Sequence, residues 1–247
     1  YMIKNVKIRL IQFLAFITLL TNLSCNDSSS YDIIIVGGGT SGVVSAIQSS
    51  RMGSKTLLIE ESNWLGGMMT SAGVSAMDGN YKLPSGFLKE FRDSLVSYYG
   101  HLDSLKTGWV SNMMFEPSVG NQILKNIANS QKNLTIKYNS IVRGVQKNES
   151  FIVNLQSGLN YESKVLIDAT ELGDLIPMLN LPYSIGMDSN KKYGEDIAPD
   201  VSNNIIQDLT YVMILKDFHK DMTIDKPKNY DRSEFICSYS SGECPQT

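Results

Sequence analysis

The sequence predicts an α/β fold built on a mainly parallel sheet, and three observations lead to that prediction. Two short apolar runs, 32–36 (DIIIV) and 55–60 (KTLLIE), lack the polar alternation of a half-exposed strand, which is typical of strands buried on both faces. The glycine-rich turn 37–42 follows the first run, and 42–52 has apolar residues at helical spacing. Strand, turn, helix and strand within about thirty residues make a βαβ unit.

The composition is that of a folded protein without a basic surface. Of the 247 residues, 42% are hydrophobic and 19% charged, which excludes a disordered chain. The formal net charge of −3 lacks the basic surplus of nucleic-acid-binding proteins, so we expect no nucleic-acid partner. Three cysteines are too few for a disulfide scaffold, and the spacing of Cys237 and Cys244 is not that of a metal site. We therefore predict no metal site, and the pairing of these two cysteines stays open.

The N-terminal segment, which ends at Cys25, has the pattern of an export signal. Lys4, Lys7 and Arg9 form a basic region before the apolar segment 10–20. At about 1.5 Å per residue this segment is too short to cross a hydrocarbon core of about 30 Å. Its end at Leu-Ser-Cys resembles a bacterial lipoprotein signal, which implies export to the periplasm or cell surface and a membrane anchor only through a lipid on Cys25. An ordinary cleaved secretory signal is the alternative.

The remaining elements follow from the same periodicities. Helices are predicted within 84–99 and from 116–117 to about 128, where a proline suits the first turn. The predicted strands are 134–138, a hairpin of 141–146 and 151–155, and a buried strand at 165–169. Beyond Pro182 the pattern weakens, which leaves one strand or helix within 201–217 and an unassigned tail.

The turn between the first strand and the first helix has the spacing of a dinucleotide-binding motif. Gly37, Gly39 and Gly42 form the motif G-x-G-x-x-G. In this motif the first glycine allows the tight turn, the second lets the backbone approach the pyrophosphate, and the third lets helix and strand pack closely. The helix N-terminus offers free backbone N–H groups and a partial positive charge to phosphates. The predicted binding residues of this turn are Gly37, Gly38, Gly39, Thr40, Ser41 and Gly42.

An acidic residue completes this motif at the end of the second strand. Glu60 lies eighteen residues after Gly42, and its carboxylate can accept hydrogen bonds from both hydroxyls of an adenosine ribose. Glu61 follows it as a second candidate. Together the turn and the acid predict a bound dinucleotide, but they do not separate NAD from FAD.

Later stretches resemble one family, the FAD-dependent oxidoreductases that are similar to fumarate reductase flavoproteins. Segment 60–68 (EESNWLGGM) resembles the stretch that follows the acid in flavoproteins of the two-dinucleotide-binding type. Segment 166–175 (LIDATELGDL) resembles the turn that usually has the sequence Ala-Thr-Gly in flavoproteins, with Glu171 in place of that glycine. Segments 183–188 (YSIGMD) and 115–117 (FEP) fit the same family.

This resemblance implies a Rossmann-like FAD-binding domain with an inserted β-hairpin region and a separate substrate domain. It implies FAD as cofactor and hydride transfer between a small organic substrate and the flavin, with an unknown electron acceptor. The chain has only two histidines, and no catalytic acid or base can be nominated. The cofactor contacts that the resemblance implies are Gly66, Gly67, Met68 and Thr70 near the pyrophosphate or ring, Val142 at the adenine, and Ala169 and Thr170 over the ADP half.

The resulting domain prediction has four parts. They are a targeting segment (1–25), a tether (26–30), an FAD-binding domain (31–180, with inserted helices at about 84–130) and the start of a substrate domain (181–247). Residues 216–247 show no glycine-rich return to the flavin site, so we expect a chain truncated at its C-terminus that by itself binds FAD weakly or not at all. Two alternatives stay open, namely an NAD-binding dehydrogenase and a non-catalytic flavin-fold fragment or surface binding module.

Overall fold

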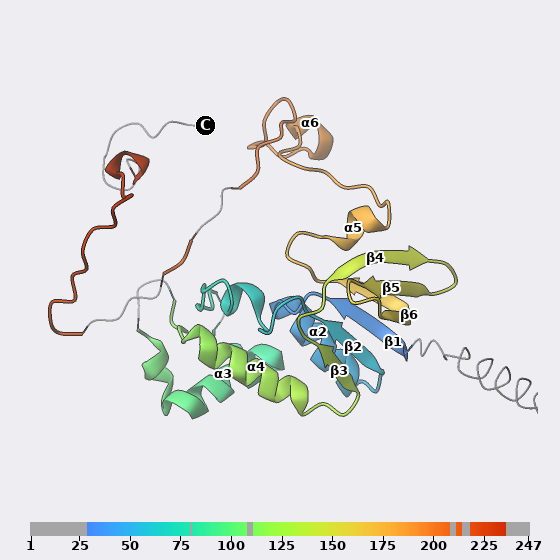
Figure 1. The fold of residues 1–247 in the computed structure, drawn as a ribbon, viewed down its shortest axis with the longest axis horizontal. Coiled ribbons are helices and arrows are strands. Elements are labelled where there is room, and N and C mark those ends of the chain that lie inside the picture. Colours follow the sequence, from blue (N-terminus) through green and yellow to red (C-terminus); the bar gives the residue numbers. More distant parts are fainter. Residues whose placement is uncertain (1–28, 80, 108–110, 208–210, 214–217, 236–247) are drawn as a thin grey trace, which may run out of the picture. The chain divides into compact units, whose positions relative to one another are not determined.

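The computed structural model describes residues 29–79, 81–107, 111–207, 211–213 and 218–235 (Figure 1). The chain divides into two compact units between Val212 and Met213, and the features described below belong to the first unit. No helix in these ranges is long and apolar enough to cross a membrane. The predicted lipidation site and the other two cysteines lie outside the described residues, and the predicted domain boundaries stay predictions.

One six-stranded sheet organises this unit, with the strand order β3-β2-β1-β6-β5-β4 (Figure 1). The first four strands of that order are mutually parallel, whereas β5 runs antiparallel to β6, and β4 antiparallel to β5. This confirms the predicted α/β class with a parallel centre and an added hairpin. The strands are β1 (Ser29–Val36), β2 (Thr56–Ile59), β3 (Leu134–Lys137), β4 (Val142–Lys147), β5 (Phe151–Leu155) and β6 (Asn160–Asp168).

The two central strands lack polar alternation because each of their faces meets a separate hydrophobic cluster. Ile35 and Leu58 belong to the cluster that the helices share, whereas Ile34 and Leu57 belong to the cluster formed with the hairpin strands. All four side chains are fully buried. Burial on both faces is what a continuous apolar run predicts for a parallel strand.

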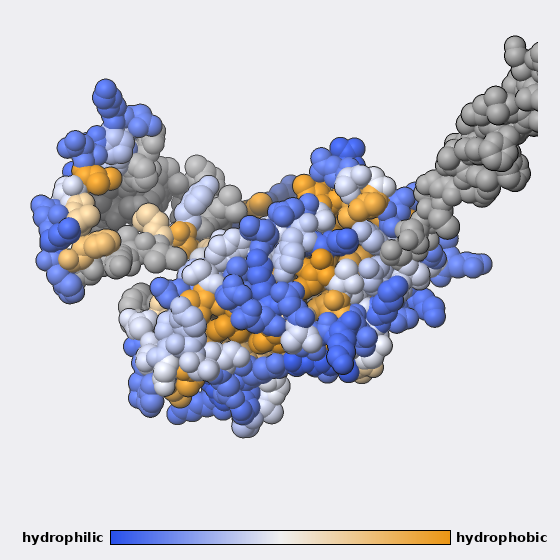
Figure 2. All heavy atoms as spheres, turned by 60° about the horizontal axis from the view of Figure 1, so that its bottom comes forward, coloured by the Kyte–Doolittle hydropathy of each residue, from blue (hydrophilic) through white to orange (hydrophobic). Residues whose placement is uncertain are grey.

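Three main helices pack on the first of these clusters. They are α2 (Thr40–Arg51), α3 (Gly86–Tyr99) and α4 (Pro117–Asn129). The proline at the first position of α4 and the helix over 86–99 are as predicted. The surface of this side of the molecule is largely hydrophilic, with smaller apolar areas between (Figure 2).

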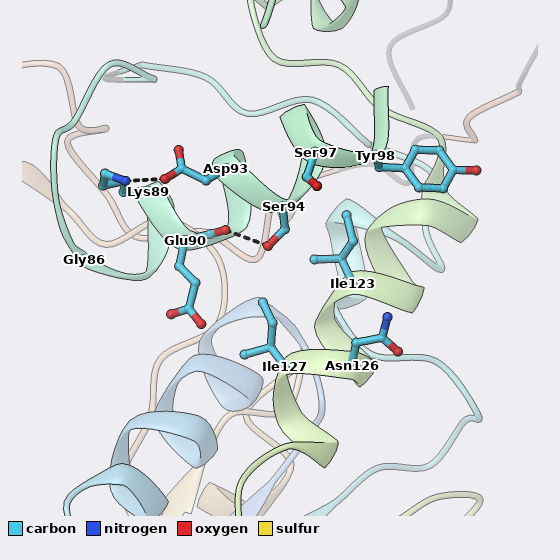
Figure 3. A pocket seen from close by; sticks show the side chains of 10 residues that line it. All are labelled: Gly86, Lys89, Glu90, Asp93, Ser94, Ser97, Tyr98, Ile123, Asn126 and Ile127. Carbon is cyan, nitrogen blue, oxygen red and sulfur yellow. Dashed lines mark hydrogen bonds and ion pairs between the residues drawn. The ribbon is translucent and has the colours of Figure 1, made fainter. Parts of the chain in front are cut away.

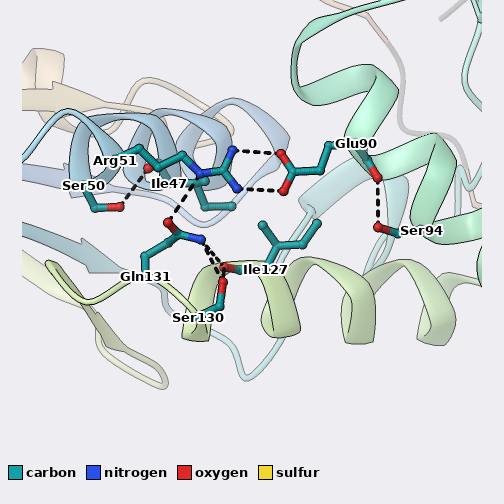
Figure 4. A network of polar contacts seen from close by, with 8 residues as sticks. All are labelled: Ile47, Ser50, Arg51, Glu90, Ser94, Ile127, Ser130 and Gln131. Atoms are coloured by element: carbon teal, nitrogen blue, oxygen red, sulfur yellow. Dashed lines mark hydrogen bonds and ion pairs between the residues drawn. The ribbon is translucent and has the colours of Figure 1, made fainter.

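A polar contact at the end of α2 joins it to the other two helices (Figure 4). The guanidinium of Arg51 donates two hydrogen bonds to the carboxylate of Glu90 in α3, at 2.7 and 2.8 Å. The Nε of Arg51 also donates to Gln131, just past the end of α4, at 3.4 Å. This contact ties the helical layer together at the end of α2.

Two sequence predictions about elements need correction. The strand predicted at 165–169 begins at Asn160, and Val165 is 46% exposed rather than buried because β5 pairs with β6 only as far as Ser163. A strand or helix is predicted within 201–217, but the described residues of this segment form neither. Ile205 and Ile206 in this segment are exposed, and an apolar run without a surface to pack against gains little from forming an element.

Candidate functional site

A cavity at the predicted motif lies where three parallel strands end. It has a volume of about 960 Å³, near the upper end of the usual range for ligand sites. Its walls come from the residues that follow β1, β2 and β6, and ligands of open parallel sheets bind at these carboxyl ends. The residues that line it include Gly37, Gly38, Gly39, Glu60, Glu61, Ser62, Gly67, Met68, Ser71, Val142, Ala169, Thr170, Glu171 and Asp174.

The glycine turn after β1 allows close backbone packing that no side chain would permit. Gly37 has φ +99°, and a Cβ there would stand 2.2 Å from the carbonyl oxygen of Ala169. A Cβ on Gly42 would stand 1.9 Å from the carbonyl oxygen of Gly37. Helix α2 then begins with no side-chain cap from Gly39 and no acidic residue in its first turn. Its free N–H groups and partial positive charge therefore suit an anion such as a pyrophosphate.

Glu60 lies at the end of β2 and faces the glycine turn. Its Oε2 accepts a hydrogen bond from the backbone N–H of Gly38 at 2.6 Å. Its Oε1 accepts from the backbone N–H and the hydroxyl of Ser62, at 2.8 and 2.6 Å. Since each carboxylate oxygen offers about two acceptor positions, Oε1 is fully used and Oε2 keeps one for a ligand. The carboxylate is thus held in place beside the turn with capacity to accept a ribose hydroxyl.

The loop that carries Gly66 and Gly67 forms the neighbouring wall of the cavity. The N–H of Gly66 donates to the carbonyl oxygen of Gly38 at 2.8 Å, and the hydroxyl of Thr40 donates to that of Gly66 at 2.9 Å. A Cβ on Gly67 would stand 2.9 Å from the Cα of Gly39, so the two loops lie against each other. Met68 and Ser71 continue this wall.

Thr70 does not line the cavity in this structure, and its predicted approach to the cofactor stays a prediction. Its side chain is 1% exposed, and its hydroxyl donates to the carbonyl oxygen of Leu65 at 2.7 Å. The threonine thus stabilises the loop that carries Gly66 and Gly67 from behind. A hydroxyl in a polar, glycine-rich segment gives no sign in the sequence of which side it faces.

The turn after β6 closes the cavity from the other side. Asp168 accepts hydrogen bonds from the N–H and the hydroxyl of Thr170, at 3.0 and 2.7 Å. Its second oxygen accepts from the N–H of Leu175, at the start of the short helix α5 (Leu175–Met178), at 3.1 Å. The hydroxyl of Thr170 in turn accepts from the N–H of Asp174 at 2.8 Å. These bonds fix the turn whose members Ala169 and Glu171 line the cavity.

The adenosine end of the predicted site lies where β4 begins. Val142 lines the cavity there, next to Ile141, whose carbonyl oxygen accepts from the N–H of Gln156 at 2.8 Å. Nearby, the hydroxyl of Tyr138 is buried without a hydrogen-bond partner in the described structure. Burial, and to a lesser degree the charge of Glu60, raises the pKa of Tyr138.

Most of the residues predicted from sequence thus come together in one cavity. Those that line it are Gly37, Gly38, Gly39, Glu60, Glu61, Gly67, Met68, Val142, Ala169 and Thr170. Thr40, Ser41, Gly42 and Gly66 lie in the adjoining turn and first helical turn rather than on the cavity wall, and Thr70 is buried. Their roles toward a cofactor stay predictions. Ser62 and Asp168, which orient Glu60 and the turn after β6, were not singled out from the sequence.

A second hollow, of about 740 Å³, lies between α3 and α4 (Figure 3). Several of its polar groups already have partners within it, since Lys89 pairs with Asp93 and the hydroxyl of Ser94 donates to the carbonyl oxygen of Glu90. It has neither a strand end nor a glycine turn. We therefore place the functional site in the first cavity. Within the described ranges, no group of three or more His, Cys, Asp or Glu residues is arranged to hold a metal ion.

The cavity suits a dinucleotide cofactor on structural grounds. Glycines stand where a Cβ would collide with backbone, an uncapped helix N-terminus faces an anion position, and an oriented carboxylate stands beside it. These are the three parts that hold the pyrophosphate and ribose in Rossmann-type sites.

Two curated proteins illustrate what this chain is similar to. A digeranylgeranylglycerophospholipid reductase of Methanococcus vannielii is 26% identical over 174 residues, which cover 67% of this chain and 43% of that protein. A beta-cyclopiazonate dehydrogenase of Aspergillus oryzae is 38% identical over 53 residues, which cover 22% of this chain and 12% of that protein. The chain therefore spans less than half the length of these relatives.

Similar solved structures include a dehydrogenase and a reductase. L-proline dehydrogenase from P. horikoshii has a TM-score of 0.37 and 22% sequence identity, and the match covers 57% of this chain and 22% of the dehydrogenase chain. Thioredoxin reductase from T. acidophilum has a TM-score of 0.38 and 18% identity, covering 57% of this chain and 35% of its own.

A family model decides the assignment. The model described as FAD dependent oxidoreductase matches residues 32–241. That range contains the strands from β2 to β6 and the entire cavity lining. Because the match extends over most of the chain, this protein belongs to the family of FAD dependent oxidoreductases.

Proposed function

We propose that the whole protein is an FAD-dependent oxidoreductase that transfers a hydride between a small organic substrate and the flavin, with a separate electron acceptor. The observation that carries this proposal is the carboxylate of Glu60 held 2.6 Å from the N–H of Gly38, inside a cavity that the family match covers. FAD, when bound, supplies the hydride chemistry at its isoalloxazine ring.

The chain's own residues bind and orient the cofactor in this proposal. Glu60 accepts a ribose hydroxyl, and the first turn of α2 with the backbone N–H of Gly39 binds the pyrophosphate. The backbone near Val142 borders the adenine, and Gly67 and Met68 border the part of the cofactor beyond the pyrophosphate. The bonds of Asp168 hold the opposite wall in place.

Flavin binding tests the cofactor part of the proposal. We expect FAD to bind the purified chain saturably, with ADP competing for the same site, as measured by quenching of flavin fluorescence. Glu60→Gln should lower the affinity for both ligands by about tenfold, because a charged acceptor of ribose hydroxyls is lost. Glu149→Gln, the same change in an exposed hairpin turn, should leave both affinities unchanged.

The absence of saturable binding of both FAD and ADP to the folded wild-type chain contradicts the proposal. Hydride transfer is tested next, by mixing the loaded protein anaerobically with a panel of alcohols, amines and hydroxy acids. A substrate should bleach the visible flavin band, and an added acceptor should restore it. Bleaching by NADH alone, with no response to any organic donor, would favour a nicotinamide-linked reaction instead.

We further propose that the protein is exported and held at a membrane by a lipid on Cys25. The support is the sequence pattern alone, with its basic start, short apolar segment and cysteine. In a bacterial host fed a clickable fatty acid, the protein should carry the label and sediment with membranes. Cys25→Ser should lose the label and leave the membrane fraction. A wild-type protein that is unlabelled and not membrane-bound contradicts this proposal.

A further inference from the structure

An acidic side chain stands at the tip of the turn that Asp168 and Thr170 stabilise. The turn runs from 168 to 175, and its polar groups bond to one another at distances of 2.7 to 3.1 Å. Glu171 lies within this turn, is exposed, and lines the cavity. Asp174, which follows in the same turn, also lines the cavity, but only Glu171 has a carboxylate oxygen placed beside the two glycine loops.

Glu171 and Glu60 reach the glycine turn from opposite sides. In the sheet, β2 and β6 lie on either side of β1, so the residues that follow them flank the turn after β1. The Oε2 of Glu171 lies 3.8 Å from the position that a Cβ on Gly67 would take, which is itself 2.9 Å from the Cα of Gly39. Glu60 instead contacts Gly38. Of the carboxylates that line the cavity, Glu60 therefore stands at one side of the pyrophosphate position and Glu171 at the other.

The carboxylate of Glu171 is open to a ligand in the cavity. Its carboxylate makes no hydrogen bond or ion pair with any residue that the structure describes, unlike Glu60 and Asp168. No lysine, arginine or histidine is among the described residues that line the cavity. A carboxylate only accepts hydrogen bonds, and a pyrophosphate has none to donate. A neighbouring group rich in hydroxyls would satisfy this side chain.

We propose that Glu171 binds the flavin half of the cofactor by accepting hydrogen bonds from the hydroxyls of its ribityl chain. This inference rests on the proposed function. FAD carries hydroxyl donors at two places, the adenosine ribose and the ribityl chain, and these flank the pyrophosphate. Glu60 serves the first and Glu171 the second, each through a charge-assisted hydrogen bond. Glu171 thereby favours FAD over ligands that end at the diphosphate.

The test compares FAD with ADP, which lacks the ribityl chain. Dissociation constants are measured by isothermal titration calorimetry for the wild type and for Glu171→Ala and Glu171→Gln. We expect Glu171→Ala to lower the affinity for FAD by about tenfold. The affinity for ADP should stay unchanged or rise slightly, because a negative charge near the diphosphate is lost. Glu171→Gln should regain part of the FAD affinity, since its amide oxygen still accepts. Glu149→Ala is the matched control for removing an exposed carboxylate.

The other outcomes separate this inference from the proposed function. If Glu171→Ala tightens FAD and ADP equally, the carboxylate only repels the diphosphate and the inference is wrong. If both affinities are unchanged, Glu171 faces solvent in the complex and the inference is also wrong. If the wild type binds neither ligand, the proposed function fails and this inference fails with it. Circular dichroism confirms that each variant is folded.

Discussion

At the scale of single residues, Ser62 competes with a ribose for the carboxylate of Glu60. Both donors of Ser62 point to the same oxygen, Oε1, at 2.6 and 2.8 Å. The hydroxyl has a second acceptor within reach, the carbonyl oxygen of Trp64 at 3.4 Å. A ribose with two hydroxyls needs two acceptor positions on Glu60, and only one is free while the Ser62 hydroxyl remains bound.

We therefore expect Ser62→Ala to tighten the binding of ADP and FAD alike by about threefold, the size of one modest neutral hydrogen bond. Titration calorimetry with both ligands measures this change. The control is Ser71→Ala, which also removes a hydroxyl from the cavity wall, but one that donates to the carbonyl oxygen of Gly67 at 3.2 Å. Weaker ADP binding in Ser62→Ala would show instead that the hydroxyl positions Glu60 or contacts the ribose itself.

The residues of the site were predictable from sequence where one spacing admits one role. Gly37 and Gly42 follow from the packing of a strand against a helix, and Glu60 from its place at the end of the next strand. Ser62 and Thr70 were not, because whether a hydroxyl faces a ligand or the backbone behind it depends on loop geometry that no periodicity encodes.

At the scale of elements, the pairing of Arg51 with Glu90 links the end of α2 to α3. The hydrogen bond from Arg51 lowers the pKa of Glu90 from its ordinary value of 4.5. A lowered pKa in the folded state adds stability that is present above the ordinary value and is lost as the pH falls through the lowered one. With 37% of the Glu90 side chain exposed, solvent screening keeps this contribution below about 1 kcal/mol.

Glu90→Gln should therefore lower the free energy of unfolding at pH 7 by less than about 1 kcal/mol. The difference from the wild type should shrink as the pH falls below 4.5, because the wild-type carboxylate then becomes protonated as well. Urea unfolding at pH 7 and at pH 3 measures both values. Glu149→Gln, which alters an exposed hairpin turn, is the control, and a difference between Glu90→Gln and wild type that persists undiminished at pH 3 contradicts the ion-pair explanation.

Element predictions succeeded where an apolar run packs on both faces and failed where packing changes along a strand. The runs at 32–36 and 55–60 became β1 and β2 because helices cover one face and hairpin strands the other. The strand β6 pairs with β1 along most of its length but loses its second neighbour, β5, beyond Ser163, so its apolar second half is partly exposed. Hydropathy alone marked only the second half.

At the scale of the whole molecule, the cofactor and the protein carry net charges of the same sign. The chain has a formal net charge of −3, and four carboxylates line the cavity, those of Glu60, Glu61, Glu171 and Asp174. The described lining contains no cationic side chain, so the pyrophosphate is attracted only by backbone N–H groups and the end of α2. These attractions act at short range, whereas the repulsion from several carboxylates acts over longer distances and is screened by salt.

Salt should therefore strengthen the binding of ADP, in contrast to sites that use lysine or arginine for phosphate. Between low ionic strength and about 0.15 M, where the screening length is about 8 Å, we expect ADP to bind a few-fold more tightly. Adenosine, which carries no phosphate charge, should show little change and serves as the control ligand. Calorimetric titrations with both ligands at several salt concentrations measure the trend. If salt weakens ADP binding while adenosine is unaffected, a cationic group outside the described lining must contact the diphosphate.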